Sequence, residues 1–107
     1  MIYGLKESEF DMILGVFNKH PEIQYVILYG SRAKGNFKQF SDVDITLVGD
    51  TLTNSIMYKV SFEIDDLLLP YQFDISIFKD LTNKDLVEHI KRKGIVIYSK
   101  VKENLMQ

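Results

Sequence analysis

The residues with the clearest chemical potential in this sequence are three aspartates, Asp42, Asp44 and Asp74. Asp42 and Asp44 stand two positions apart at the start of an apolar run, so in a β-strand both side chains leave the same face of the sheet. Asp74 lies at a polar position of a second, alternating run. If the two strands are neighbours, three carboxylates meet on one surface, and their repulsion is costly unless a divalent cation neutralises it. Oxygen ligands without His or Cys favour Mg²⁺ or Mn²⁺, and pairs of such ions support displacement at phosphorus.

A Gly-Ser pair ends the apolar run that precedes these aspartates. Gly30 has no Cβ, so an oxyanion can come close to the backbone, and the Ser31 hydroxyl and the following amides can donate hydrogen bonds. Arg32 and Lys34 add positive charge. Taken alone, the pair is more typical of an ordinary turn than of a phosphate site. Beside three carboxylates, it indicates phosphate binding by Gly30, Ser31 and Arg32.

Simpler roles and rival motifs fit these residues less well. Any one of the aspartates alone is more simply a solvated turn or strand residue, but three on one face are uncommon because carboxylates are depleted from strands. Gly30 and Gly35 have Walker A spacing, yet Asn-Phe follows where Lys-Ser/Thr is required. An aspartyl-phosphatase nucleophile at Asp42 should end an apolar strand, whereas residues 36–41 are mostly polar. A sugar-nucleotide transferase using Asp42 and Asp44 on Mn²⁺ would need a longer donor domain.

The hydrophobic pattern predicts the elements that must position these residues. Capping patterns at Ser8 and Thr82 and apolar residues at helical spacing indicate helices, and β-rich or alternating runs indicate strands. In chain order these elements cover residues 8–19, 25–29, 43–48, 53–68, 72–78, 82–93 and 95–98. The order αββαβαβ favours an α+β (mixed α/β) domain. We expect a mixed β-sheet with the helices packed on one face and the acidic metal site on the other.

Length and composition limit the remaining possibilities. The 107 residues, 46% of them apolar, suit one folded domain at residues 1–107, with a frayed tail at residues 99–107. A net charge of -2 argues against a protein that binds nucleic acid or anionic membranes non-specifically. Without cysteine there is no disulfide, thiolate metal site or Cys nucleophile. No apolar run is long enough to cross a membrane, and no signal-peptide pattern opens the chain, so we expect a cytoplasmic protein.

Together these motifs resemble the signature of the DNA polymerase β-like nucleotidyltransferase superfamily. The matching residues are Gly30-Ser31-x-Ala33-x-Gly35, five further residues, and Ser41-Asp42-x-Asp44 before an apolar strand. The chain looks like the minimal nucleotidyltransferase (MNT) branch, most specifically over residues 26–48. The resemblance implies that Asp42 and Asp44 bind both metal ions and that Asp74 is the third carboxylate, placed to activate the attacking hydroxyl. It also implies that Gly30 and Ser31 hold the phosphates of the nucleotide.

The activity implied by this resemblance is Mg²⁺-dependent transfer of a nucleoside monophosphate, AMP from ATP in the first instance, to a hydroxyl acceptor. Larger relatives carry a helical domain for the base and the acceptor, which is not found in this sequence. Minimal nucleotidyltransferases are often paired with a separate helical HEPN protein, and in many such pairs the nucleotidyltransferase is an antitoxin that adenylylates the toxin. The alternative is a non-catalytic nucleotide-binding or antitoxin subunit that acts by partner binding only. The retained cluster of repulsive carboxylates favours the enzyme.

Overall fold

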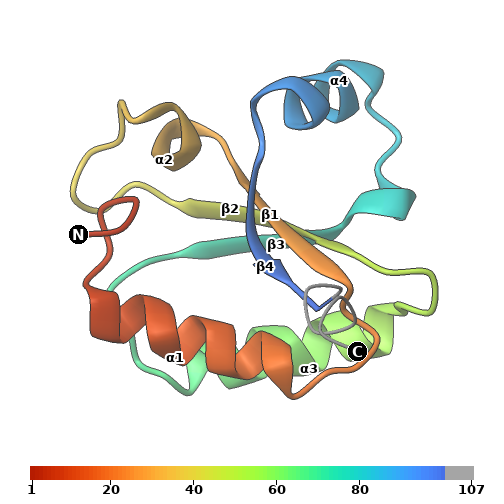
Figure 1. Cartoon of the computed structure of the whole chain (residues 1–107), viewed down its shortest axis with the longest axis horizontal. Coiled ribbons are helices and arrows are strands. Elements are labelled where there is room, and N and C mark those ends of the chain that lie inside the picture. The colour runs from red at the N-terminus through yellow and green to blue at the C-terminus, as the bar shows by residue number, and fades with distance from the viewer. Residues whose placement is uncertain (101–107) are drawn as a thin grey trace, which may run out of the picture.

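A four-stranded sheet forms the centre of the protein in a computed structural model, which describes residues 1–100 (Figure 1). Its strands are β1 (Tyr25–Tyr29), β2 (Val43–Val48), β3 (Phe73–Ile77) and β4 (Ile95–Ser99). They lie in the order β3-β2-β1-β4. Strand β1 runs antiparallel to β2 and β4, whereas β3 runs parallel to β2. The sheet is therefore mixed, as the sequence predicts.

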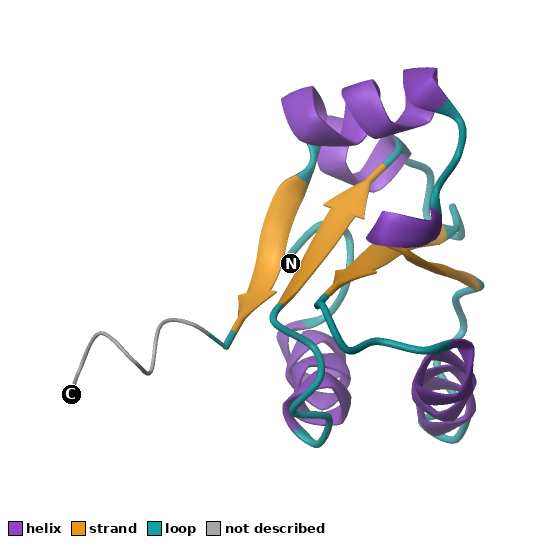
Figure 2. Ribbon diagram, turned by 90° about the vertical axis from the view of Figure 1, so that its right-hand side faces the viewer, coloured by secondary structure: helices purple, strands orange, loops and turns teal. Residues whose placement is uncertain are grey.

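Two helices of similar length cover one face of this sheet, α1 (Glu7–Asn18) and α3 (Asn54–Asp65) (Figures 1 and 2). Each helix has an apolar stripe that packs against alternate residues of the strands, because side chains on a strand alternate between its two faces. The core between the layers includes Val16 and Phe17 of α1, Val60 and Ile64 of α3, and Val26, Leu28, Val43, Ile45 and Leu47 of the sheet. The polar residues between these strand positions consequently face the other side.

The other face is partly covered as well, which differs from the expected arrangement. Helices α2 (Ser31–Lys34) and α4 (Lys84–Lys93) and the 3₁₀ turn η1 (Phe78–Asp80) lie on this side of the sheet (Figure 2). Gly94, directly after α4, lies so close to Ile27 of β1 that a Cβ atom would collide with it. Ile27 gives this face an apolar side chain beside the amphipathic α4, whose Ile90 is buried.

The predicted elements agree closely with the structure, apart from their ends. Strands β1 and β2 have the predicted limits, and α3 begins after the N-cap Thr53, whose Oγ1 accepts a hydrogen bond from the Ile56 amide. The predicted cap at Thr82 is wrong by one residue, because the Asn83 side chain accepts from the Leu86 amide at 3.1 Å. No helix of residues 1–100 is both long and apolar enough to cross a membrane.

The chain ends differ from the prediction at two places. Helix α1 begins at Glu7 and not at Ser8, because the Glu9 carboxylate accepts a hydrogen bond from the Lys6 amide at 2.8 Å. Ser99 belongs to β4, and the amide of Lys100 donates to the Gln24 carbonyl at 2.9 Å, so this part of the predicted frayed tail extends the sheet. The rest of that tail, residues 101–107, lies outside the described residues.

Candidate active site

Asp44 and Asp74 lie directly opposite each other on neighbouring strands. They are partners in the parallel register of β2 and β3, and neighbouring strands lie about 4.8 Å apart. Both side chains leave the face away from α1 and α3, because the flanking Val43 and Ile45 are buried in the core on the opposite face. Asp42 precedes β2 by one residue and lies near enough for its charge to raise the pKa of Asp44. The structure therefore brings the three predicted aspartates together.

The electrostatics of this group follow from burial and like charge. The pKa of Asp44 is raised above its ordinary value, first by partial burial and then by the negative charges of Asp74 and Asp42. Asp42 and Asp74 are exposed, whereas Asp44 is half-buried between them. As placed, the side chains of residues 1–100 include no group of three His, Cys, Asp or Glu residues arranged to hold a metal ion. A cation shared by all three carboxylates would thus require rotation of these side chains.

Gly30 places the end of β1 against Asp44. Its φ of 77° lies in the left-handed region, and a Cβ atom here would collide with Oδ2 of Asp44, so only glycine meets both conditions without strain. Tyr29, one residue earlier, is the register partner of Asp44. Ser31, the first residue of α2, is half-buried. The Gly-Ser pair therefore adjoins the aspartates, as the sequence predicts.

A family model of polymerase β nucleotidyltransferases matches residues 11–103, which include the Gly-Ser pair and all three aspartates. The chain belongs to this family. The prediction of a nucleotidyltransferase domain is thereby confirmed. No curated protein matches the sequence significantly.

Solved structures share the fold of this nucleotidyltransferase domain at low sequence identity. A toxin–antitoxin with AMP-PNP is 20% identical, with a TM-score of 0.68, over 95% of this chain and 80% of that chain. The complex of a tri-AMPylated HEPN toxin from Shewanella oneidensis with an MNT antitoxin is 16% identical, with a TM-score of 0.65, over 95% and 79%. A putative nucleotidyltransferase from Sulfolobus solfataricus is 20% identical, with a TM-score of 0.53, over 90% and 87%. These similarities confirm the predicted fold class.

Hydroxyl groups line the sheet beside the aspartates of the nucleotidyltransferase domain. Ser76 Oγ of β3 donates a hydrogen bond to Thr46 Oγ1 of β2 at 2.9 Å. The pKa of Tyr29 is raised mainly by burial, with a smaller contribution from the charges of Asp74 and Asp44, while a hydrogen bond with Ser76 opposes the increase. The sequence pattern alone predicts no role for Tyr29. Tyr29 ends the strand that leads into the Gly-Ser pair, and this position next to Gly30 is the signal that could have indicated its place beside the aspartates.

Arg32 does not join this group, which corrects the expectation that it contacts phosphate. The side chain is only 1% exposed. Its guanidinium donates four hydrogen bonds of 2.8 to 3.2 Å to main-chain carbonyl oxygens of Tyr3, Gln39 and Ser41. These bonds hold the guanidinium inside the fold. The Arg32 charge, which we expected to contact the phosphates of the nucleotide, instead links main-chain segments of the domain.

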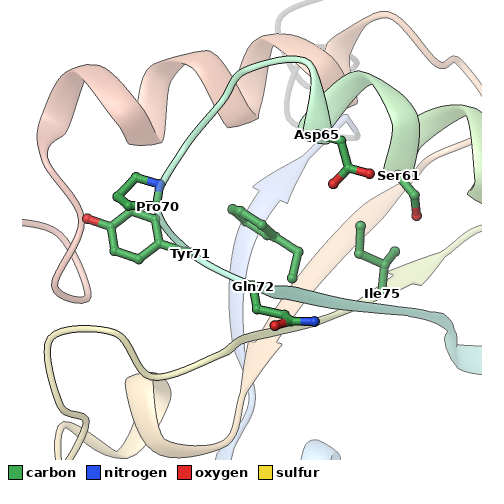
Figure 3. Close-up of a pocket in the computed structure, with 7 residues that line it drawn as sticks. Ser61, Asp65, Pro70, Tyr71, Gln72 and Ile75 are labelled. Atoms are coloured by element: carbon green, nitrogen blue, oxygen red, sulfur yellow. The ribbon is translucent and has the colours of Figure 1, made fainter.

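A pocket of about 540 Å³ lies elsewhere, between the end of α3 and the strand β3 (Figure 3). Its lining consists of Ser61, Asp65, Pro70, Tyr71, Gln72, Phe73 and Ile75. Ser61 and Asp65 come from α3, which covers the sheet face opposite the aspartates (Figure 1). The pocket contains none of the predicted site residues, so it is separate from the candidate active site around Asp44.

Proposed function

We propose that this domain transfers a nucleoside monophosphate from a nucleoside triphosphate, ATP in the first instance, to a hydroxyl acceptor. The observation that carries this proposal is the alignment of Asp44 with Asp74 across β2 and β3, with Gly30 packed against Asp44. The arrangement unites a carboxylate group that attracts cations with a backbone turn that phosphate can approach. Membership in the nucleotidyltransferase family supports the reaction class.

The three aspartates would hold Mg²⁺, with Mn²⁺ as the alternative ion. The donor set fits these metals because it consists of carboxylate oxygens without His or Cys. When bound, the metal would offset the repulsion among the carboxylates and stabilise negative charge on the phosphates. The partial burial of Asp44 makes its uncompensated charge the most costly of the three.

The other roles follow from the positions of the residues. Gly30 leaves room for phosphate oxygens at the end of β1, and the Ser31 hydroxyl donates a hydrogen bond to them. Asp74, exposed at the outer strand of the sheet, accepts the proton of the acceptor hydroxyl. The hydroxyl oxygen then forms a bond with the α-phosphorus, the bond between this phosphorus and the bridging oxygen breaks, and pyrophosphate leaves with the electron pair.

The acceptor hydroxyl in this proposal belongs to a separate helical protein of the HEPN type, and the domain acts as the antitoxin of such a pair. Two observations support this. The fold is similar to that of an MNT antitoxin solved with an AMPylated HEPN toxin. Asp42 and Asp74 are exposed, so the site is open on the side from which a protein acceptor would approach.

The test is transfer of labelled AMP from ATP to the HEPN-type partner in the presence of Mg²⁺. We expect Asp44→Asn to lose transfer about 10²-fold or more, since metal-ion stabilisation of the transition state contributes several kcal/mol. Asp50→Asn is the matched control, because Asp50 is an exposed aspartate beyond the other end of β2. Unchanged transfer by Asp44→Asn would remove this residue from the site. A wild type that binds the partner tightly but transfers nothing would favour the non-catalytic alternative.

A further inference from the structure

Arg32 is the largest of the fully buried side chains among residues 1–100. An arginine side chain stays charged at all relevant pH values, and burying a charge is costly unless hydrogen bonds compensate it. The side chain begins on α2, directly after Ser31, and its guanidinium reaches the segment that enters β2. It therefore links the predicted phosphate side of the site with the segment that carries the first aspartate.

Two of the four hydrogen bonds of this guanidinium meet on one peptide group. Nε and Nη2 both donate to the carbonyl oxygen of Ser41, at 3.1 and 2.8 Å, and Nη2 also donates to the Gln39 carbonyl at 3.2 Å. The Ser41 carbonyl belongs to the planar peptide that joins Ser41 to Asp42. Two bonds to that oxygen hold in place the peptide that leads directly into Asp42.

Two aromatic rings and a further hydrogen bond hold the guanidinium itself in place. The rings of Phe37 and Tyr71 lie 5.1 and 5.0 Å from its carbon atom, within the range of cation–π contacts. Nη1 donates to the Tyr3 carbonyl at 2.9 Å. The N-terminal turn packs so tightly here that a Cβ on Gly4 would collide with Phe37 and Nη1. A lysine could supply the charge at this place but not the planar fork of donors.

We propose that Arg32 is a positioning residue that fixes Asp42 relative to Ser31 and so sets the geometry of the metal site. This inference rests on the proposed function, because it assigns Asp42 to metal binding. Asp42 lies outside β2, and its side chain is exposed. The peptide after Asp42 is held by the Val43 amide, which donates to the Gln72 carbonyl at 2.8 Å, and the peptide bonded to Arg32 is the anchor on the other side of Asp42. Arg32 then acts through Asp42 and touches neither the nucleotide nor the metal.

The proposal is tested with Arg32→Lys, which retains a positive charge but loses the bidentate contact with the Ser41 carbonyl. We expect the affinity for Mn²⁺, measured by electron paramagnetic resonance of the free ion, to fall about tenfold or more. A loss of this size is typical when a residue that orients a metal ligand is removed. In the transfer assay we expect kcat to fall about 10²-fold, the size of effect produced by a misplaced ligand, with little change in the KM for ATP.

The control for a merely structural effect is Ile64→Val, in the core between α3 and the sheet. This variant should lower the melting temperature without changing the Mn²⁺ affinity or kcat. If Arg32→Lys behaves in the same way, Arg32 only stabilises the fold and the inference is wrong. If Arg32→Lys raises the KM for ATP and leaves the Mn²⁺ affinity unchanged, Arg32 contacts the phosphates, which also overturns the inference.

Phe37→Leu provides a second variant in case Arg32→Lys does not fold. It removes one of the two rings that hold the guanidinium and should change Mn²⁺ affinity in the same direction but less. Wild-type Mn²⁺ affinity in Phe37→Leu would count against positioning. The Mn²⁺ comparison does not depend on turnover, so a wild type that binds Mn²⁺ but transfers nothing refutes the proposed function alone. Loss of transfer in Asp44→Asn together with wild-type behaviour of Arg32→Lys refutes the positioning role alone.

Discussion

Replacement of Asp44 by Asn should make the metal-free domain more stable, although it removes a residue of the proposed active site. The side chains have the same shape, and Asp44 is half-buried opposite Asp74. The pKa of Asp44 is raised by this burial and by its acidic neighbours, so the folded protein favours the neutral form of the group. Asparagine is neutral at every pH. In EDTA, the variant should therefore melt above the wild type.

The size of this effect follows from the register of the two strands. Charges about 5 Å apart, close to the spacing of neighbouring strands, repel by about 0.8 kcal/mol in water and about 3 kcal/mol at an effective dielectric constant of 20. Asp74 is exposed, so the lower end applies, about 1 kcal/mol. For a domain of about 100 residues this raises the melting temperature by about 4 to 8 °C.

The pH dependence of this difference has a definite sign. The pKa of Asp44 is higher in the folded protein than in the unfolded protein, so protonation of Asp44 stabilises the fold. This stabilisation is complete when the pH lies below the pKa of Asp44 in the unfolded protein. It is lost as the pH rises through the pKa of Asp44 in the folded protein. The advantage of Asp44→Asn should therefore be present at neutral pH. It should shrink as the pH falls through the raised pKa of Asp44 towards its ordinary value of 3.8.

Mg²⁺ and ATP should reverse the order of the two proteins. A ligand at one hundred times its Kd that binds only the folded state stabilises it by about 2.7 kcal/mol, or about 10 °C or more for this size of domain. The wild type should gain this increase in differential scanning fluorimetry, and Asp44→Asn should gain much less. A wild type that does not respond, together with an Asn variant that is destabilised in EDTA, would refute the reasoning, because Asp44 would then be a structural residue.

Two further substitutions, Gly30→Ala and Ser31→Ala, probe the turn that faces Asp44, with Gly35→Ala as the control. Gly30→Ala and Gly35→Ala both place a Cβ at positive φ, where the strain is about 1 to 2 kcal/mol. Only the Cβ at residue 30 meets Asp44, so Gly30→Ala alone should lose the increase in melting temperature that Mg²⁺ and ATP produce. Equal increases in the two variants would contradict the proposed site. Ser31→Ala should leave the EDTA melting temperature unchanged and remove about 1 kcal/mol of nucleotide binding, about 4 to 8 °C of the response; a full response would show that the hydroxyl does not contact the nucleotide.

The parts of the site that the sequence predicts are those set by local periodicity. The alternation around Asp44 and Asp74 determines which face each side chain occupies, because the period of a strand is two residues. In both strands Asp44 and Asp74 occupy the polar positions of the alternation. If the strands are neighbours, any register that pairs polar positions with polar positions brings the two carboxylates to the same face. Gly30 follows a buried strand and precedes a turn. These features need no knowledge of distant contacts.

Arg32 could not be placed in this way. Its position two residues after Gly30 suggested an exposed cation near phosphate, but two of its partners come from distant segments: Tyr3 lies 29 positions earlier in the chain, and Tyr71 belongs to the loop before β3. Backbone carbonyls leave no trace in a sequence pattern, since every residue has one. The location of α4 has a similar cause. Its amphipathic pattern predicts that one face is buried, but not on which side of the sheet.

The start of α1 shows that tertiary contacts can also decide a local feature. Ser8 and Asp11 suggested a capping box, whereas the buried Glu9 accepts hydrogen bonds from the Lys6 amide and, at 2.9 Å, from the Tyr71 hydroxyl. Glu9→Ala would leave both donors without their acceptor, which costs about 1 to 3 kcal/mol and lowers the melting temperature by about 4 °C or more. Ser8→Ala, at an exposed position one residue away, should stay within about 0.5 kcal/mol of the wild type. Equal losses in the two variants would mean that Ser8 caps the helix after all. Since the Tyr71 ring also lies against the Arg32 guanidinium, Glu9→Ala should in addition weaken Mn²⁺ binding, linking the start of α1 to the geometry of Asp42.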